Sequence, residues 1–500
     1  MTPRWQPPPC ATLFGNRGSG KTETLKQMLM RLALDGRVAT VVLDLPGTLG
    51  TDMVGHLCAK GLQKRTYFDA ARFTDRVPQW PFFIRSMATD PFKRRIEDEQ
   101  AIAELLQGPL SQRGLKSGIN NPWIRQYSEA AGWVWGLQPT RLHILKLLKF
   151  YERGAEWNQM LDRTDAAAEA QMFRNLAERD GARGQYAVET GGAYRLLEPA
   201  LSSPAVYLRD GDSWDWEEKL LAKSQVYFDL SEVKQEAARA LAIFVCSAVI
   251  NACKRYFGRT GKPLFVVIVL EEAGALDLVT PLIITAMQAW RKAGVSVIVC
   301  SQTVMDFEEE TRETLLALTD VHIWHAMKAG VDRAAEDLAN PTFDPKEVFY
   351  TRERKQVAGH REIETTSSGE SRSFDVVSGK LANAVRHDER TGKHFLPEYE
   401  TVVEEVYKTP ALHLQEFKSK VATLQVGECL VRDKDGVRLE RVTMLGEAWK
   451  LGLTPIRTQK AITAIRAREC YRTPESPLPP PPAPPPPPPA PKRRKPRGMA

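Results

Sequence analysis

The sequence lacks the patterns of a disulfide-rich or zinc-binding protein. Its seven cysteines include no C-x-x-C pair and no regular spacing, which argues against a disulfide framework and against a zinc ribbon. It also lacks a membrane-spanning segment, because its longest apolar run, 240–250, falls well short of the roughly 20 residues that cross a bilayer. No basic and apolar leader opens the chain. We therefore expect a cytoplasmic protein without direct membrane insertion, peripheral at most to a membrane complex.

The body of the chain has little excess charge of either sign. The net charge is +7, and five of these charges belong to the cluster KRRKPR at 492–497, which leaves only +2 for everything before it. A near-neutral body neither supports nor excludes nucleic acid as a partner, because a motor can concentrate its positive charge in one channel. The composition, 43% hydrophobic and 26% charged over 500 residues, is that of a globular protein of two to four domains.

A phosphate-binding motif lies close to the start of the sequence. The stretch LFGNRGSGKT at 13–22 fits the pattern G-x-x-x-x-G-K-[ST] through Gly15, Gly20, Lys21 and Thr22. In such a loop, backbone N–H groups surround a phosphate, the lysine neutralises charge and the threonine hydroxyl holds Mg²⁺. A short strand is expected over 11–14 and an amphipathic helix over 23–34, which is the context that the motif requires. The sequence therefore predicts a nucleotide-binding site for ATP and Mg²⁺.

The rest of the chain alternates between strand and helix patterns around a long helical interruption. Continuous β-branched runs predict buried parallel strands, and amphipathic segments follow them, so we expect an α/β fold with a mostly parallel sheet of the P-loop type. Further strands are expected at 38–44, 65–69, 225–230, 263–270, 295–300 and 321–324, and helices at 214–221, 234–256, 279–292 and 313–318.

Changes of texture divide the chain into five parts. We expect a first motor segment at 1–92, an all-α insertion at 93–212, a second motor segment at 213–345, a β/α region at 346–470 and a proline-rich basic tail at 471–500. Within the fourth part, 365–373 (TTSSGESRS) reads as a flexible loop, and 423–442 as a hairpin around Asp435-Gly436. The tail is expected to be disordered polyproline, either a solubilising terminus or a docking segment for a partner.

Polar residues follow the predicted strands where a P-loop site needs them. Glu271 and Glu272 end the strand at 263–270, where the first acid would assist Mg²⁺ and the second would activate water. Two solvated acids at the start of a helix are the plainer alternative. Gln302 follows the strand at 295–300 and could position water or contact the γ-phosphate, or it is an ordinary loop residue. Arg291 ends the helix at 279–292, either as a cation favoured by the helix dipole or as an arginine finger for a neighbouring subunit.

Two histidines stand in an H-x-x-H pattern at His322 and His325. Residues three apart on a strand point to opposite faces, so this pattern does not predict a metal pair. We expect both histidines to be structural.

Taken together, these motifs resemble the HerA and FtsK superfamily of P-loop ATPases. The order GNRGSGKT, VVLDLPGT, a helical insert, VYFDLS, VVIVLEEAG, WRKAG and VIVCSQT is closest to conjugative coupling proteins of the TraG and TraD type, and LQVGECLV at 424–431 resembles the family's later "kGe" strand. The resemblance implies that Gly18, Ser19 and Gly20 join Lys21 and Thr22 in holding phosphate and Mg²⁺. It also implies that Glu271 and Glu272 are the Walker B acids, Gln302 the motif glutamine and Arg291 the trans arginine.

The sequence departs from these relatives in two ways. They usually have aspartate at the position of Glu271, and they usually begin with transmembrane helices, whereas here the motif begins at Gly15. The resemblance thus implies a hexameric ring without the membrane anchor, capped by the insertion. We expect an ATP-hydrolysing motor that translocates DNA in conjugative or mobile-element transfer, with relaxase or secretion-channel proteins as partners. The alternatives are a viral DNA-packaging or secretion ATPase, and a scaffold that binds ATP without hydrolysing it.

Overall fold

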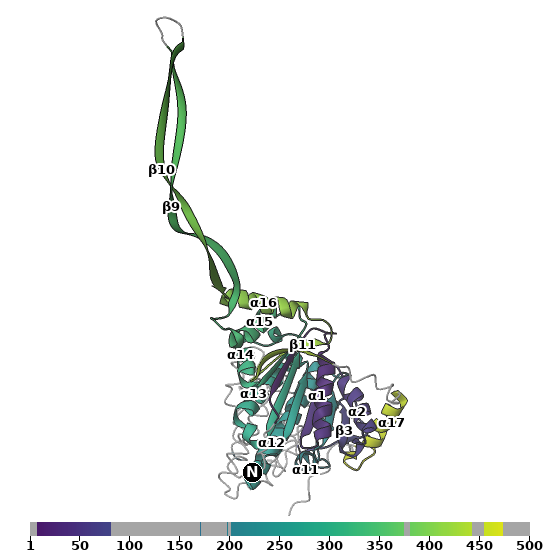
Figure 1. Cartoon of the computed structure of the whole chain (residues 1–500). Coiled ribbons are helices and arrows are strands. Elements are labelled where there is room, and N and C mark those ends of the chain that lie inside the picture. The colour runs from purple at the N-terminus through teal and green to yellow at the C-terminus, as the bar shows by residue number, and fades with distance from the viewer. Residues whose placement is uncertain are drawn as a thin grey trace, which may run out of the picture. The chain divides into compact units, whose positions relative to one another are not determined.

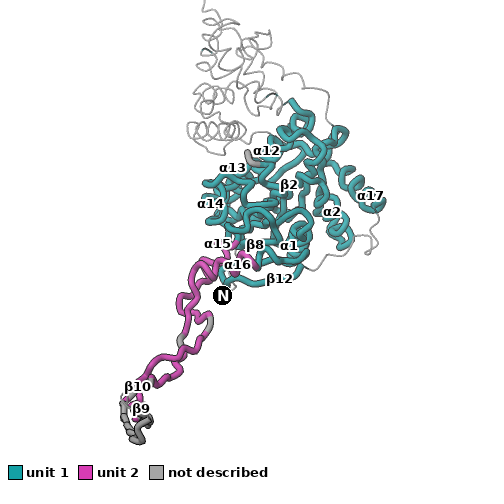
Figure 2. The backbone as a smooth tube through the Cα atoms, turned by 90° about the horizontal axis from the view of Figure 1, so that it is seen from above, with its two compact units in different colours: residues 1–334, 420–500 teal, residues 335–419 magenta. Residues whose placement is uncertain are grey.

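The computed structural model describes residues 8–81, 171, 198, 202–374, 381–442 and 455–473. Nearly all of the predicted insertion at 93–212 and of the proline-rich tail lie outside these residues. The described chain forms two compact units, residues 1–334 with 420–500 and residues 335–419 (Figure 2). The phosphate-binding motif belongs to the first unit.

Unit 1 is built on a nine-stranded sheet with the strand order β12-β11-β8-β1-β7-β6-β2-β5-β3. The seven strands from β8 to β3 are parallel to one another, while β11 pairs antiparallel with β8 and with β12. Every residue of β1, β2, β5, β6 and β7 is buried, as expected for strands covered on both faces. This confirms the predicted α/β class. The strands are β1 (Ala11–Phe14), β2 (Ala39–Asp44), β3 (Thr66–Ala70), β5 (Gln225–Asp229), β6 (Val266–Glu271), β7 (Val295–Ser301), β8 (Val321–His325), β11 (Glu428–Asp433) and β12 (Gly436–Arg441).

The helices cover both faces of this sheet because the chain reverses its direction across it. From β1 it moves toward β3 through α1 and α2, and from β5 it returns toward β8 through α12, α13 and α14. Parallel crossovers are right-handed, so the two sets of helices lie on opposite faces (Figure 1). These helices are α1 (Lys21–Asp35), α2 (Leu49–Ala59), α12 (Gln235–Thr260), α13 (Thr280–Ala289) and α14 (Glu309–Leu318).

Helix α12 is the one described helix long and apolar enough to cross a membrane by length and composition. In unit 1 it is a core helix, and 89% of its most apolar window is buried inside the protein. It packs on α13 and on two short helices, α10 (Pro204–Tyr207) and α11 (Trp216–Leu221).

The two described ends that flank residues 82–201 are fastened to each other. Trp80 forms a parallel bridge with Asp210, its N–H donates to the carbonyl of Arg209 at 2.9 Å, and Gly211 donates back to Trp80 at 3.2 Å. Trp216 packs edge-on against both Trp80 and Trp214, and Trp80 packs edge-on against Phe228 of β5. The chain thus leaves and re-enters the sheet domain at one aromatic cluster.

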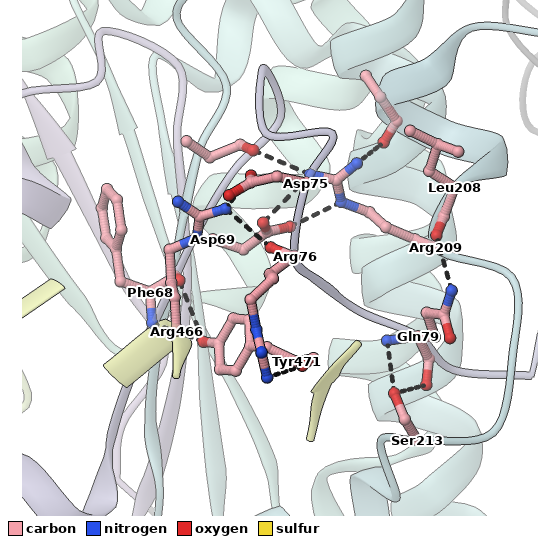
Figure 3. Close-up of polar contacts among 12 residues, drawn as sticks. Phe68, Asp69, Asp75, Arg76, Gln79, Leu208, Arg209, Ser213, Arg466 and Tyr471 are labelled. Carbon is pink, nitrogen blue, oxygen red and sulfur yellow. Dashed lines mark hydrogen bonds and ion pairs between the residues drawn. The ribbon is translucent and has the colours of Figure 1, made fainter. Parts of the chain in front are cut away.

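The C-terminal part of unit 1 covers the β3 edge of the sheet. Helix α17 (Pro455–Arg466) packs on α2 and β3, and β13 (Tyr471–Arg472) pairs with β4 (Val77–Pro78). The hydroxyl of Tyr471 accepts the N–H of Phe68 at 3.1 Å and donates to its carbonyl at 3.0 Å (Figure 3). An edge strand otherwise exposes such groups to pairing with another chain, and here they are occupied internally.

Unit 2 contains a long antiparallel hairpin of β9 (Val348–Phe374) and β10 (Leu381–Tyr407). At its base Lys408 forms ion pairs with Glu347 and Glu416, and His413 packs between Phe343 and Phe417. The helices at its ends are α15 (Val331–Ala339) and α16 (Pro410–Thr423).

The predicted flexible loop at 365–373 is wrong, because these residues belong to β9. Thr365 to Ser371 pair one to one with Gly392 to Arg386. Their serine and threonine side chains suggested a loop, but the facing strand supplies the hydrogen bonds that a polar strand needs. The hairpin predicted around Asp435-Gly436 is present as β11 and β12.

Candidate nucleotide-binding site

The predicted phosphate loop joins β1 to α1 at the carboxyl edge of the parallel strands. Gly18 and Gly20 have φ values of 82° and 102°, a region that suits glycine alone. At Gly15, a Cβ would lie 2.5 Å from Cβ of His325, so no larger residue fits there. Helix α1 begins at Lys21 without a side-chain cap on its first turn, which leaves backbone N–H groups available to an anion.

The lysine of this loop contacts Glu272, the acid that directly follows β6. Lys21 Nζ lies 3.2 Å from Glu272 Oε1, and the lysine side chain is only 6% exposed. Glu272 itself has a φ of 56°, and Lys223 is the one other non-glycine residue with positive φ in the described chain. Such a conformation costs roughly 1–2 kcal/mol in a non-glycine residue. The backbone at the end of β6 is therefore strained where the carboxylate faces the phosphate loop.

The first acid of β6 is held against the threonine of the loop. The Thr22 hydroxyl donates to Glu271 Oε1 at 3.1 Å, while the second oxygen, Oε2, is buried and accepts no hydrogen bond from any residue that the structure describes. Burial raises the pKa of Glu271 to about 8, and the neighbouring Asp44 carboxyl adds to this effect. A hydroxyl and a carboxylate with an unused oxygen form a donor set that suits Mg²⁺, which takes few protein ligands and keeps its waters or phosphate oxygens.

Asp44 lies beside Glu271 because β2 and β6 are neighbours in register. It is fully buried and accepts the N–H groups of Gly47 at 2.8 Å and Gly50 at 2.7 Å, at the start of α2. Burial also raises the pKa of Asp44, although these N–H groups and the contact with Glu271 oppose the effect. The contact between the two carboxyls therefore acts in opposite directions, raising the pKa of Glu271 and lowering that of Asp44. On its other side, Asp44 is in register with Asp229 of β5.

Gln302 follows β7, which lies between β1 and β6. The residue is exposed, and the loop that carries it is fixed by a capping box of Thr303 and Asp306. Ser301 also donates to the Asp306 carboxylate. The glutamine thus projects from a rigid support between the phosphate loop and the two acids.

Arg291 lies near the amino ends of the parallel strands, on the side of the sheet opposite to the phosphate loop. It does not end helix α13 as predicted, since α13 stops at Ala289 and Arg291 begins a short 3₁₀ turn before β7. Its guanidinium binds Asp320 through two contacts, at 2.7 and 3.2 Å. The seven residues of β7 separate this position from the phosphate edge by roughly 20 Å. Arg291 therefore does not reach the phosphate loop of its own chain.

His325, the last residue of β8, packs against the phosphate loop beside Gly15. Its Nε2 lies 3.0 Å from the Thr24 hydroxyl, and it is fully buried beside Gly15. Burial lowers its pKa to about 4, and the charge of Lys21 acts in the same direction. His322 instead contacts Thr319 and Arg432, so the two histidines face apart as expected. The described residues contain no group of three or more acidic, histidine or cysteine side chains that could hold a metal.

Gly427 covers the loop from the other side. Its N–H donates to the Ser19 carbonyl at 3.0 Å, and a Cβ on Gly20 would lie 3.0 Å from its Cα. Neither His325 nor Gly427 is among the predicted site residues, although the LQVGECLV motif contains the glycine. The structure brings together nine of the predicted site residues and leaves Arg291 apart: Gly15, Gly18, Ser19, Gly20, Lys21, Thr22, Glu271, Glu272 and Gln302.

The architecture matches solved structures of a conjugative coupling protein. The unbound form of TrwBΔN70 superposes with a TM-score of 0.55 at 15% identity, covering 89% of this chain and 87% of that one. The chain has the fold of this coupling protein. TrwB in complex with ADP and Mg²⁺ gives a TM-score of 0.53 at 13% identity, covering 88% and 86% of the two chains. TrwB with a non-hydrolysable ATP analogue gives 0.53 at 14%, with the same coverage.

At these identities the likeness establishes the coupling-protein fold and confirms the resemblance at that level. No protein-family model matches the chain, and no curated protein matches it.

Proposed function

We propose that this protein is an ATP-hydrolysing ring motor that translocates DNA, in conjugative or mobile-element transfer. The observation that carries the proposal is the meeting of Lys21 and Thr22 with Glu272 and Glu271 at one edge of the sheet. A phosphate-binding lysine, a metal-binding hydroxyl and two carboxylates are the parts that P-loop ATP hydrolysis needs. The coupling-protein fold, and the ADP, Mg²⁺ and ATP-analogue complexes of TrwB, support this assignment.

In this proposal the phosphate loop from Gly15 to Thr22 binds the nucleotide, and Thr22 and Glu271 hold Mg²⁺. The metal, when bound, neutralises charge on the β and γ phosphates. Because burial raises the pKa of Glu271 to about 8, the carboxyl must lose a proton before it can bind the metal. Its Oε2, which accepts no hydrogen bond from a described residue, is the oxygen available to the metal. Asp44 remains tied to the start of α2 and orients Glu271 from behind.

Glu272 activates the attacking water, and Gln302 orients it or contacts the γ-phosphate. In the structure, Oε1 of the Glu272 carboxylate lies 3.2 Å from Nζ of Lys21. Binding of phosphate at Lys21 would replace this contact and release Glu272 for proton transfer. The strained backbone at Glu272 fits such a role, because strain of this kind gathers at functional positions.

Arg291 acts in trans in this proposal. It is 39% exposed, and its partner Asp320 is equally exposed, so the pair is accessible to another subunit. Because its own phosphate loop lies at the opposite edge, only a neighbour's nucleotide would come within its reach. This requires a ring, which we propose to be a hexamer, with residues 93–212 as an all-α domain that meets the DNA. Relaxase or secretion-channel proteins are the proposed partners, and the proline-rich tail is a candidate docking segment.

The test is ATP turnover of the purified full chain with and without single- and double-stranded DNA. The proposal expects DNA to stimulate turnover, and it expects Lys21→Ala to abolish nucleotide binding. Glu272→Gln should keep binding but lose turnover. Lys60→Ala is the matched control, because Lys60 is an exposed lysine at the end of α2, outside the site. ATP binding without turnover under any DNA condition would overturn the motor proposal.

One observation favours a second candidate, a scaffold that binds ATP without hydrolysing it. Glu271 is buried, its pKa is raised to about 8, and a protonated carboxyl is a poor ligand for Mg²⁺. The scaffold predicts nucleotide-dependent assembly with no phosphate release, and Glu271→Asp would then create turnover. A viral packaging or secretion ATPase would share the fold, and a neighbouring capsid or relaxase gene distinguishes these uses.

A further inference from the structure

Arg17 lies in the turn of the phosphate loop, and the function proposed above assigns it no role. The N–H of Ser19 donates to the carbonyl of Asn16 at 3.1 Å, which closes a tight turn with Arg17 and Gly18 at its centre. The φ of 82° at Gly18 is that of the third residue of a type II turn. The turn is fixed on both sides, since Asn16 donates to Ala326 and Ser19 accepts from Gly427. Arg17 is thus held at a defined point of the loop.

The guanidinium of Arg17 is exposed and makes no hydrogen bond or ion pair with any residue that the structure describes. Other cations along the same edge of the sheet are engaged. Lys21 pairs with Glu272, Lys26 with Glu23 and Asp52, and Arg72 with Asp229. The space beside Arg17 is also open, because a Cβ on Gly18 would meet nothing within 4 Å. The turn of the phosphate loop therefore carries an exposed cation that has open space beside it and no partner among the described residues.

We propose that Arg17 is a catalytic residue that acts in cis, contacting the γ-phosphate of ATP bound to its own chain. This inference rests on the proposed function, because it assumes that the loop holds ATP. An arginine is always protonated and presents its N–H groups in a planar fork that matches phosphate oxygens. Arg291 sits at the far edge of the sheet and pairs with Asp320, so the chain's own loop arginine is the one placed to meet its own nucleotide.

In the reaction, an oxygen of water forms a bond to the γ-phosphorus while the bond from phosphorus to the bridging oxygen breaks. Glu272 takes the water proton, and ADP leaves with the bridging oxygen and its electron pair. Arg17 exchanges no proton, and its charge opposes the negative charge that spreads over the transferring group. Donors placed for charge that develops in the transition state accelerate turnover by about 10²–10³ each.

The experiment compares full-length Arg17→Ala and Arg17→Lys with the unchanged protein. Arg31→Ala is the matched control, because Arg31 is an exposed arginine on the outside of α1. Three quantities are measured: steady-state ATP turnover, the ratio of affinities for a non-hydrolysable ATP analogue and for ADP, and trapping of ADP with aluminium fluoride, which mimics the transferring phosphoryl group.

We expect Arg17→Ala to lower turnover by about 10²–10³, to abolish trapping with aluminium fluoride and to lose the preference for the ATP analogue. Its affinity for ADP should stay within about threefold, and Arg17→Lys should recover part of the trapping, because lysine keeps the charge without the fork. Arg31→Ala should match the unchanged protein in all three.

The inference is overturned if Arg17→Ala turns over and traps normally. An equal loss of affinity for ADP and for the ATP analogue would also overturn it, since this marks a general effect on the loop. The two proposals fail separately. If the unchanged protein binds ATP but does not hydrolyse it, the motor proposal fails. The ratio of affinities for the ATP analogue and for ADP then still tests whether Arg17 contacts the γ-phosphate. If it binds no nucleotide, both fail.

Discussion

Asp69 and Glu271 are both buried carboxyls at the ends of parallel strands of one sheet, and their surroundings differ. Asp69, on β3, receives two hydrogen bonds from Arg209, at 2.6 and 3.1 Å, and the same guanidinium also donates to the carbonyls of Ala70 and Ala205 (Figure 3). Glu271, on β6, receives one hydroxyl, faces another carboxyl and keeps an unpaired oxygen. We infer that a buried carboxylate with a full set of hydrogen bonds, such as Asp69, stabilises the fold. One with an oxygen that accepts no hydrogen bond, such as Glu271, is available to bind a ligand.

The largest effect is expected from breaking the satisfied pair. Arg209→Met should lower the free energy of unfolding by about 3–5 kcal/mol, because it leaves Asp69 buried without a counter-ion. Burial raises the pKa of Asp69 even though the charge of Arg209 lowers it. The loss of solvation therefore already outweighs the ion pair, and removing Arg209 leaves it unopposed by that charge. Denaturant unfolding of the full chain measures the change.

The double variant Asp69→Leu with Arg209→Met sharpens this prediction. Replacing both partners by apolar residues removes the uncompensated charge, so the double variant should be more stable than Arg209→Met alone. If it is equally unstable, then lost packing rather than the unpaired charge explains the effect.

The second prediction concerns His325, the buried base below the phosphate loop. Its pKa is about 6.5 in an unfolded chain and about 4 in the folded one, so between these values the unfolded chain binds more protons. Its contribution to stability is therefore complete above pH 6.5 and is lost as the pH falls toward 4, by about 3 kcal/mol in total.

The measurement is urea unfolding at several pH values between 4 and 7. His325→Gln should flatten the loss of stability across this range, because glutamine has no proton to bind. His360→Gln, at an exposed position of β9, is the control and should leave the slope unchanged. An unchanged slope in His325→Gln would show that other groups cause the acid sensitivity.

A smaller effect on stability is expected from Tyr471, whose hydroxyl pairs with the backbone of the edge strand β3. Tyr471→Phe removes the hydroxyl that pairs with both the N–H and the carbonyl of Phe68. Leaving those groups buried without partners should cost about 1–3 kcal/mol. Tyr399→Phe, 61% exposed on β10, should change stability by less than 0.5 kcal/mol in comparison. Equal midpoints for the two variants would contradict the role assigned to Tyr471.

The sequence predicts the α/β class well because its buried parallel strands are continuous β-branched runs, such as VVIVL before Glu271. It does not predict α2, which contains Gly50 and Gly55 and is buried along most of its length, so no amphipathic period marks it. The pairing of β9 with β10 is missed for another reason. A polar strand has no sequence signature when its partner, and not a core, determines its structure.

For the candidate site, the motif spacing finds the loop and the two acids, but their surroundings depend on strand order. Asp44 meets Glu271 only because β2 and β6 are neighbours in register. His325 lies below Gly15 because β8 pairs with β1, and Gly427 arrives from a segment some 400 residues away in sequence. These contacts bring together distant parts of the chain, and no local pattern encodes them.

The last and smallest effect tests the strain at Glu272. With a φ of 56°, an alanine at this position remains strained, whereas a glycine does not. Glu272→Gly should therefore be more stable than Glu272→Ala by about 1 kcal/mol, while both lose the carboxylate. Lys223 has the same φ of 56° outside the site, so Lys223→Gly against Lys223→Ala should give the same difference.

These four variants separate backbone strain from chemistry. If glycine and alanine at 272 are equally stable while those at 223 differ, then the strain at Glu272 is relieved once its contact with Lys21 is lost. In that case the ion pair with Lys21, and not the backbone, imposes the positive φ of Glu272. If both positions show the difference, the backbone of β6 itself imposes the conformation, and Glu272 is presented to the phosphate loop before any nucleotide binds.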